Sequence, residues 1–165
     1  MTDRDEVDRI VESWQEVRPD LDFTPLMVLS RVKRLARHLE RERKTAFATA
    51  GLESWEFDVL SALRRSGDPF ELSPKNLVQQ TLVSSGTMTN RIDRLMIRSL
   101  VERRGDPHDG RGVLVRLTPD GQSRVDAAIE RLLLAEVELL DGLGRADQER
   151  VAKLLRKLSN AFDGG

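Results

Sequence analysis

The chain has 165 residues, 39% of them hydrophobic, and a formal net charge of −1 at pH 7. This length suffices for one domain with a hydrophobic core, or for one domain with added dimerisation helices. The sequence contains no cysteine, which excludes a disulfide framework, a thiolate metal site and a thiol redox switch. It has no apolar run of about 18 residues that could span a membrane, and residues 2–6 are acidic, unlike the basic start of a signal peptide. We therefore expect a cytoplasmic protein.

Two amphipathic helices are predicted at the N-terminal end. Apolar residues at helical spacing predict the first helix over residues 7–17. Thr24 and Pro25 are typical of an N-cap and a first helical position, so a second, long helix should begin there and end near Gly51. We expect residues 1–50 to provide N-terminal dimerisation helices.

The middle of the chain, residues 51–118, has the pattern of a winged helix-turn-helix. Turn-forming residues separate several short periodic segments, and a hairpin with a polar loop over residues 105–112 follows them. The expected elements are a helix over residues 54–65, a short strand over 70–72, a helix over 74–80, a helix capped by Ser84 or Ser85, and strands over 101–104 and 113–117.

Residues 119–165 are expected to form C-terminal dimerisation helices, with a break at residues 142–144. They carry more leucine than one small winged domain can cover, which favours a dimer interface. The alternative is a C-terminal helical hairpin folded over its own domain. The predicted fold class is therefore mainly α with a small β-hairpin wing: one compact chain with a winged helix-turn-helix and dimerisation helices at both ends.

The helix after Ser84 has the two faces expected of a DNA recognition helix. Met88, Ile92 and Leu95 gather on one side as a core-facing stripe, because each helical residue advances by roughly 100°. Short polar side chains and arginines occupy the other side, and these residue types bind phosphates and base edges of double-stranded DNA. The predicted DNA-binding residues are Ser84, Ser85, Thr87, Thr89, Asn90, Arg94, Arg98 and, in the wing, Arg111.

The charge of the whole chain does not have the basic excess that is common in DNA-binding proteins. Within residues 84–111, however, six arginines stand against four acidic residues. The basic charge is thus concentrated where the sequence predicts contact with DNA.

The order of the expected helices and three sequence motifs resemble the MarR family of bacterial transcription regulators, and the resemblance covers nearly the whole chain. The motifs are Leu-Val-Ser-Ser-Gly-Thr-Met-Thr-Asn-Arg-Ile-Asp-Arg-Leu over residues 82–95, Asp-Pro-x-Asp-x-Arg-Gly over 106–112 and Leu-Thr-Pro-x-Gly over 117–121. The extra N-terminal helix with Trp14, and the segments 18–22 and 56–60, resemble the PecS or urate-responsive branch of that family. Where the wing of the family often carries Asp-Arg-Arg, this chain has Gly110 in place of the first arginine.

The resemblance implies a homodimer that binds a palindromic operator and is released by urate or a related purine. It assigns ligand binding to Trp14, Asp58 and Arg91. Each has a simpler interpretation: Trp14 as an anchor of the dimer core, and Asp58 and Arg91 as a structural salt bridge, or Arg91 as a phosphate contact. Asp58 lies in an otherwise apolar helix, so it needs a partner if it is buried.

Two hypotheses of function follow. The first is a ligand-responsive transcriptional repressor, and the alternative is a constitutive winged-helix DNA-binding or architectural protein without a small-molecule switch. A protein-interaction module without DNA is a third interpretation. The sequence has no nucleophile elbow, phosphate-binding loop or histidine-rich metal spacing, so we expect no enzyme activity, no metal and no cofactor.

Overall fold

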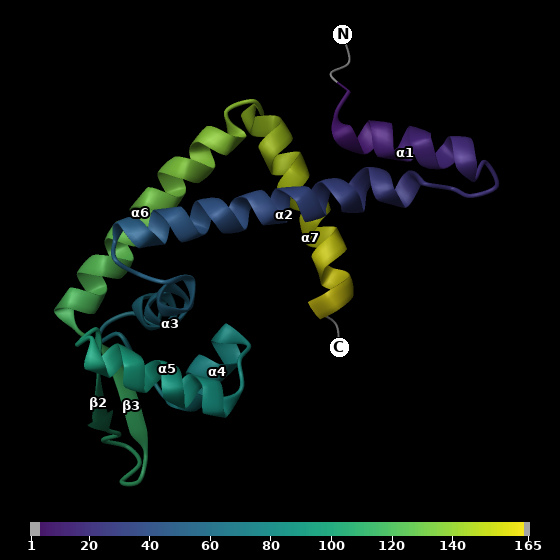
Figure 1. The fold of residues 1–165 in the computed structure, drawn as a ribbon. Helices are drawn as coiled ribbons and strands as arrows, with labels where there is room; N and C mark the ends of the chain where they lie inside the picture. Colours follow the sequence, from purple (N-terminus) through teal and green to yellow (C-terminus); the bar gives the residue numbers. More distant parts are fainter. Residues whose placement is uncertain (1–3, 164–165) are drawn as a thin grey trace. The chain divides into compact units, whose positions relative to one another are not determined.

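The computed structural model describes residues 4–163 (Figure 1). Residues 2 and 3 of the acidic start, and the extreme ends of the two expected groups of dimerisation helices, lie outside these residues. Among the described residues, no helix is both long and apolar enough to cross a membrane. The chain divides into two units, residues 1–45 and residues 46–165, each with its own internal packing.

The first unit contains α1 (Glu6–Val17) and most of α2 (Thr24–Thr49). The Asp5 carboxylate caps α1 by accepting hydrogen bonds from the backbone N–H groups of Val7 and Asp8, at 2.8 and 3.1 Å. The hydrogen bond from Asp8, together with the guanidinium of Arg31, lowers the pKa of Asp5 below its ordinary value. Arg31 of α2 also forms ion pairs with Asp5 and Asp8, at 2.9 and 2.8 Å. These ion pairs fasten the start of α1 to α2.

The start of α2 differs from the sequence prediction. The sequence predicts Thr24 as the N-cap, but Thr24 is the first residue of the helix. The Asp22 carboxylate accepts hydrogen bonds from the Thr24 backbone N–H at 2.9 Å and from its hydroxyl at 2.6 Å. Asp22 therefore satisfies the first N–H of the helix, a task to which an aspartate is at least as well suited as a threonine.

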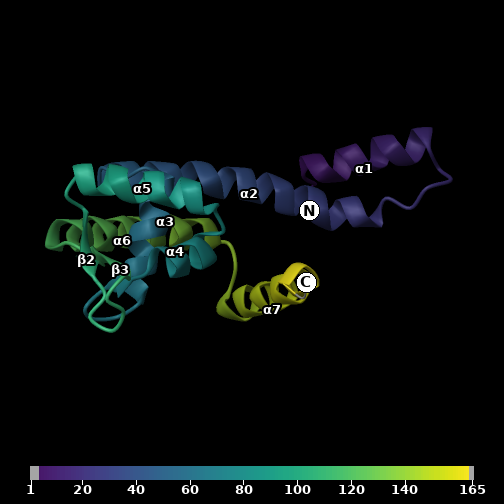
Figure 2. The same ribbon diagram turned by 90° about the horizontal axis from the view of Figure 1, so that it is seen from below.

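The second unit contains all the other helices and strands of the described chain. They are α3 (Ser54–Arg65), β1 (Glu71–Leu72), α4 (Pro74–Thr81), α5 (Ser85–Ile97), β2 (Val101–Gly105), β3 (Val113–Leu117), α6 (Pro119–Leu140) and α7 (Arg145–Asp163). β3 lies between β1 and β2 and is antiparallel to both, with Val101 opposite Leu117 and Gly105 opposite Val113. The β2–β3 hairpin extends beyond α3, α4 and α5 as an arm (Figures 1 and 2). The predicted mainly helical winged helix-turn-helix is confirmed.

The hydrophobic core of the second unit draws on more of the chain than the predicted lobe of residues 51–118. Phe47 from the end of α2 stacks on Phe57 of α3, with ring centroids 4.0 Å apart. At the other end, the core includes residues of α6 such as Val125 and Leu132. The first half of α6 therefore belongs to the packing of this lobe.

Serine caps define the helix-turn-helix. Ser73 caps α4, and Ser84, rather than Ser85, caps α5 by accepting a hydrogen bond from the Thr87 backbone N–H at 3.2 Å. Between the two helices, Leu82 adopts a left-handed conformation with φ of 55°, which lets the chain turn sharply. This turn sets the direction in which α5 leaves α4.

Several helices carry large apolar side chains that their own unit does not bury. In the first unit, Trp14 and Leu35 are examples; in the second, Val137 of α6 and Phe162 of α7 are 66% and 81% exposed. On α7, every residue whose side chain is described is exposed or half-buried. Large apolar side chains that a unit leaves exposed favour burial against a partner surface.

We expect Gly121→Ala to destabilise the second unit by about 3 kcal/mol, because overpacking a tight core is costly. A Cβ atom at Gly121 would lie 2.1 Å from the backbone carbonyl oxygen of Leu100. That oxygen is held in place by a hydrogen bond from the Thr118 N–H. The free energy of unfolding, measured by urea denaturation, tests this prediction. Gly142→Ala is the matched control, because no atom lies within 4 Å of its added Cβ, and an equal effect of the two substitutions would contradict the prediction.

Candidate nucleic-acid interface

Helix α5 presents one face to the core and the other to solvent. Met88, Ile92 and Leu95 are buried, as the sequence predicts. The predicted DNA-binding residues are exposed, and they are Ser84, Ser85, Thr87, Thr89, Asn90, Arg94, Arg98 and Arg111. Accessible polar side chains along such a helix are what contact with phosphates and base edges requires.

The N-terminal turn of α5 is organised by hydroxyl groups. The Ser84 hydroxyl donates to Thr87 Oγ1 at 2.9 Å, and the Thr89 hydroxyl donates to the Ser85 carbonyl oxygen at 3.1 Å. These contacts orient short side chains around the N-terminal end of the helix, whose partial positive charge favours an anion. A DNA phosphate is an anion of the kind that such a helix end attracts.

Two arginines of α5 lie against an aromatic ring from α3. The guanidinium carbon of Arg94 is 4.6 Å from the ring centroid of Trp55, and that of Arg91 is 5.7 Å from it. Arg94 also approaches Glu53, with Nη2 3.6 Å from Oε2. Arg91 is half-buried, at the edge between the two faces of α5, as its position in the sequence predicts. No local pattern predicts this contact of Trp55, because residues 55 and 91 meet only in the folded lobe.

Arg98 makes an ion pair that sequence reasoning missed. Its Nη1 lies 2.5 Å from both carboxylate oxygens of Glu56, and its Nη2 donates to the Gly51 carbonyl oxygen at 2.8 Å. Glu56 is only 2% exposed and also accepts a hydrogen bond from the Glu53 backbone N–H at 2.9 Å. The guanidinium predicted to contact DNA is thus committed to a buried carboxylate. The spacing of Glu53 and Glu56 around a helix start was the one available signal, since a glutamate at this position commonly turns back to the N-cap.

The wing is held together by local hydrogen bonds and by ion pairs at its base. The Asp109 carboxylate accepts a hydrogen bond from the Arg111 backbone N–H at 3.1 Å, which leaves the Arg111 side chain exposed near the tip. At the base, Arg103 of β2 pairs with Asp93 of α5 at 2.8 Å. Arg116 of β3 pairs with Glu71 of β1 at 3.1 Å. The arm is therefore fixed to the recognition helix on one side and to β1 on the other.

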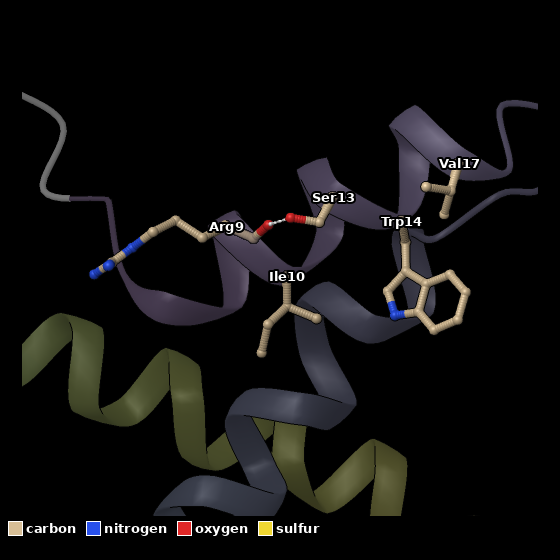
Figure 3. Close-up of a pocket in the computed structure, with 5 residues that line it drawn as sticks. All are labelled: Arg9, Ile10, Ser13, Trp14 and Val17. Atoms are coloured by element: carbon tan, nitrogen blue, oxygen red, sulfur yellow. Dashed lines mark hydrogen bonds between the residues drawn. The ribbon is translucent and has the colours of Figure 1, made fainter.

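Trp14 lies in the first unit, on α1. It is 48% exposed and stacks on Phe23, with ring centroids 5.9 Å apart. Ile10 and Trp14 point to the same side of α1 and line a shallow hollow with other residues of that helix (Figure 3). An exposed, oriented indole is able to stack on a flat ligand or on an apolar partner.

Asp58 lies in α3 of the second unit, and its side chain is exposed. Asp58 therefore does not carry the desolvation cost of a buried carboxylate. The buried carboxylate of this helix belongs to Glu56, two residues earlier. Asp58 as a ligand-binding residue stays a prediction, as do Trp14 and Arg91. Among residues 4–163, no cluster of three histidine or acidic side chains has a geometry that could hold a metal ion.

A two-helix motif with a polar, exposed second helix and a β-hairpin arm defines a winged helix-turn-helix DNA-binding protein. Residues 50–112 match the model of the MarR family. The chain is 30% identical over 153 residues to the HTH-type transcriptional regulator PecS of Dickeya dadantii (strain 3937). This match covers 93% of this chain and 92% of PecS. The chain belongs to the MarR family of transcriptional regulators.

Solved structures agree with this membership. One is the structure of Bordetella bronchiseptica BpsR, whose DNA binding is regulated by 6-hydroxynicotinic acid. Its sequence is 32% identical to this chain, the TM-score is 0.59, and the match covers 78% of this chain and 98% of BpsR. A mutant of MarR from E. coli complexed with operator DNA is 25% identical with a TM-score of 0.68, and covers 84% of this chain and 99% of that one.

We expect Glu56→Gln to lower the free energy of unfolding by about 2–3 kcal/mol, because it leaves Arg98 without its buried counter-charge. Chemical denaturation measures this loss. Glu102→Gln is the matched control: Glu102 is an exposed acid of β2, so its neutralisation should change stability by less than about 0.5 kcal/mol. Equal stability of Glu56→Gln and the wild type would show that the pair contributes little to folding.

Proposed function

We propose that this protein is a homodimeric repressor that binds a palindromic operator through α5 and the wing and is released by urate or a related purine. The observation that carries the DNA-binding part is the exposed polar face of α5, directly opposite the buried stripe of Met88, Ile92 and Leu95. The regulatory role is supported by the family and by PecS, a transcriptional regulator. Because its relatives are regulators, we propose no enzyme activity.

The chemistry of each DNA-facing group indicates which part of the DNA it would contact. The hydroxyl and amide groups of the first turns, from Ser84 to Asn90, suit phosphate oxygens and base edges. Arg94 can form two parallel hydrogen bonds with a guanine edge, whereas Arg111 at the wing contributes a positive charge to the backbone. Arg98 holds Glu56, so we assign it a supporting role rather than a contact with DNA.

Dimerisation is supported by the apolar side chains that α1, α6 and α7 leave exposed. They include Ile10, Leu133, Leu154 and Leu158. A second copy of the chain would bury this surface in a symmetric interface, and two lobes would then read two half-sites of a palindrome. The N-terminal helices up to residue 50 and the C-terminal helices after residue 118 would share this task.

The ligand part of the proposal is supported by the chemistry of Trp14 and Arg91. The indole of Trp14 offers a flat surface, and the guanidinium of Arg91 suits an ionised ring. The DNA binding of BpsR is regulated by 6-hydroxynicotinic acid, a small flat heteroaromatic acid that, like urate, is an anion at neutral pH. Arg91 lies on the recognition helix, so a ligand that binds it would favour an orientation of α5 that fits DNA poorly.

We expect Arg94→Ala to weaken operator binding by about 1–3 kcal/mol and to relax base preference at one position, because Arg94 is assigned to a base edge. Arg111→Ala should weaken binding more uniformly across sequences, because it removes a phosphate contact. Fluorescence anisotropy with a duplex that the wild type selects from a random-sequence library measures both effects.

The matched control for these arginines is Arg145→Ala, whose side chain on α7 is 94% exposed and lies outside the proposed interface. Unchanged affinity in both Arg94→Ala and Arg111→Ala would contradict the assignment of α5 and the wing to DNA.

We expect urate to raise the apparent dissociation constant for the operator by about 5- to 150-fold at saturation, which corresponds to a coupling of roughly 1–3 kcal/mol. Asp58→Asn removes a charge but keeps the shape, so it should reduce this response while leaving DNA affinity nearly unchanged. Trp14→Phe should also reduce it. Operator affinity across a urate titration measures the response of each protein.

The same titration on Glu102→Gln controls for the loss of one acidic charge. Equal responses in Asp58→Asn and the wild type would remove Asp58 from the ligand site. No response of the wild type up to millimolar urate would overturn urate as the effector, and the titration would then be repeated with 6-hydroxynicotinic acid.

A further inference from the structure

Glu53, Trp55 and Arg94 form a cluster where the start of α3 meets α5. The indole N–H of Trp55 donates a hydrogen bond to Glu53 Oε2. Arg94 Nη2 lies 3.6 Å from the same oxygen, and the Arg94 guanidinium covers the Trp55 ring at 4.6 Å. One carboxylate oxygen and one aromatic face thus hold the arginine that the proposed function directs at DNA.

The position of the Glu53 carboxylate is fixed from two sides. Glu53 is the N-cap residue of α3, where the partial positive charge of the helix end favours an anion. The indole of Trp55 then orients the carboxylate by its hydrogen bond. Glu53 is therefore in position before DNA arrives, and no large rearrangement is needed for it to hold Arg94.

The pair between Glu53 and Arg94 is open to solvent. The two side chains are 64% and 55% exposed, and ion pairs of this kind contribute little to stability. It differs in this respect from the neighbouring pair of Arg98 with Glu56, in which the carboxylate is 2% exposed. The exposed pair can be broken by a competing anion without unfolding the lobe.

We propose that Glu53 is an intramolecular competitor of DNA for Arg94, and so lowers the affinity of the lobe for duplex DNA. This inference rests on the proposed function, because it assumes that α5 meets DNA. A DNA phosphate or base edge that approaches Arg94 must either displace the Glu53 carboxylate or leave that negative charge facing the DNA backbone. Both alternatives cost free energy in the complex, and neither cost exists once the carboxylate is neutral.

The test uses the whole 165-residue chain and the duplex that the wild type selects from a random-sequence library, because the proposed function assigns Arg94 to a base edge that only such a duplex presents. Anisotropy titrations at one fixed, low salt concentration should show that Glu53→Gln binds about twofold to fivefold more tightly than the wild type, the range expected for an exposed ion pair. Glu102→Gln, which neutralises another exposed acid of the same lobe, controls for the general effect of one negative charge. An affinity gain in Glu102→Gln equal to that in Glu53→Gln would overturn the proposal.

A double-mutant cycle decides whether Glu53 acts through Arg94. In an Arg94→Gln background, Glu53→Gln should change DNA affinity by less than about 1.5-fold, because the arginine that it restrains is absent. A gain in this background as large as in the wild type would assign the effect to charge alone and overturn the proposal. Urea denaturation of each variant checks that the lobe is folded at the temperature of the titration.

The outcomes separate this inference from the function on which it rests. If the wild type binds no duplex at low salt, the proposed function is wrong and the competition falls with it. If the wild type binds DNA and Glu53→Gln binds with the same affinity, the competition alone is wrong. Tighter binding by Glu53→Gln that disappears in the Arg94→Gln background supports both.

Discussion

The buried ion pair between Glu56 and Arg98 is the contact on which the geometry of the DNA-binding lobe depends. Glu56 lies in the first turn of α3, and Arg98 caps the end of α5. The same guanidinium reaches the Gly51 carbonyl oxygen between α2 and α3. One side chain therefore contacts two neighbouring sites that lie 42 and 47 residues earlier in the sequence, and it fixes the end of the recognition helix to the start of α3. A carboxylate buried in this way is costly unless it is paired, so any arrangement of the two helices that separates the pair is disfavoured.

The sequence predicts the features of the fold that depend on neighbouring residues, but not the contacts between residues far apart in the chain. The stripe of Met88, Ile92 and Leu95 and the hairpin follow from periodicities of 3.6 and 2 residues, and the serine caps follow from the preference of serine for the N-cap position. The structure has all of them. The partner of Arg98 lies 42 residues away, and no periodic pattern reports such a contact. For the same reason, the sequence pointed to Asp58 as the carboxylate at risk of burial, whereas the fold turns Asp58 outward and Glu56 inward. Two positions that are two residues apart on a helix differ by roughly 200°, so the identity of the buried acid depends on a rotation that only tertiary packing sets.

The lobe balances most of its basic charge internally. Arg103 pairs with Asp93, and both Arg104 and Arg116 pair with Glu71. These pairs brace the wing against α5 and β1, and they explain how a chain with a net charge of −1 has an arginine-rich face without strong self-repulsion. Much of the positive charge at this face thus fixes the positions of the recognition helix and the wing.

This internal pairing also bears on how DNA binding would respond to salt. An unpaired arginine that contacts a phosphate releases a condensed counterion from the DNA, and affinity falls steeply with salt for each such contact. An arginine that leaves a carboxylate for a phosphate exposes a new anion, which attracts counterions of its own and offsets part of that release. Arg94, which Glu53 holds, would be of this second kind wherever the proposed function brings it against a phosphate. The recognition helix would then exchange one anion for another, which would make DNA binding depend less on salt than the number of its arginines predicts.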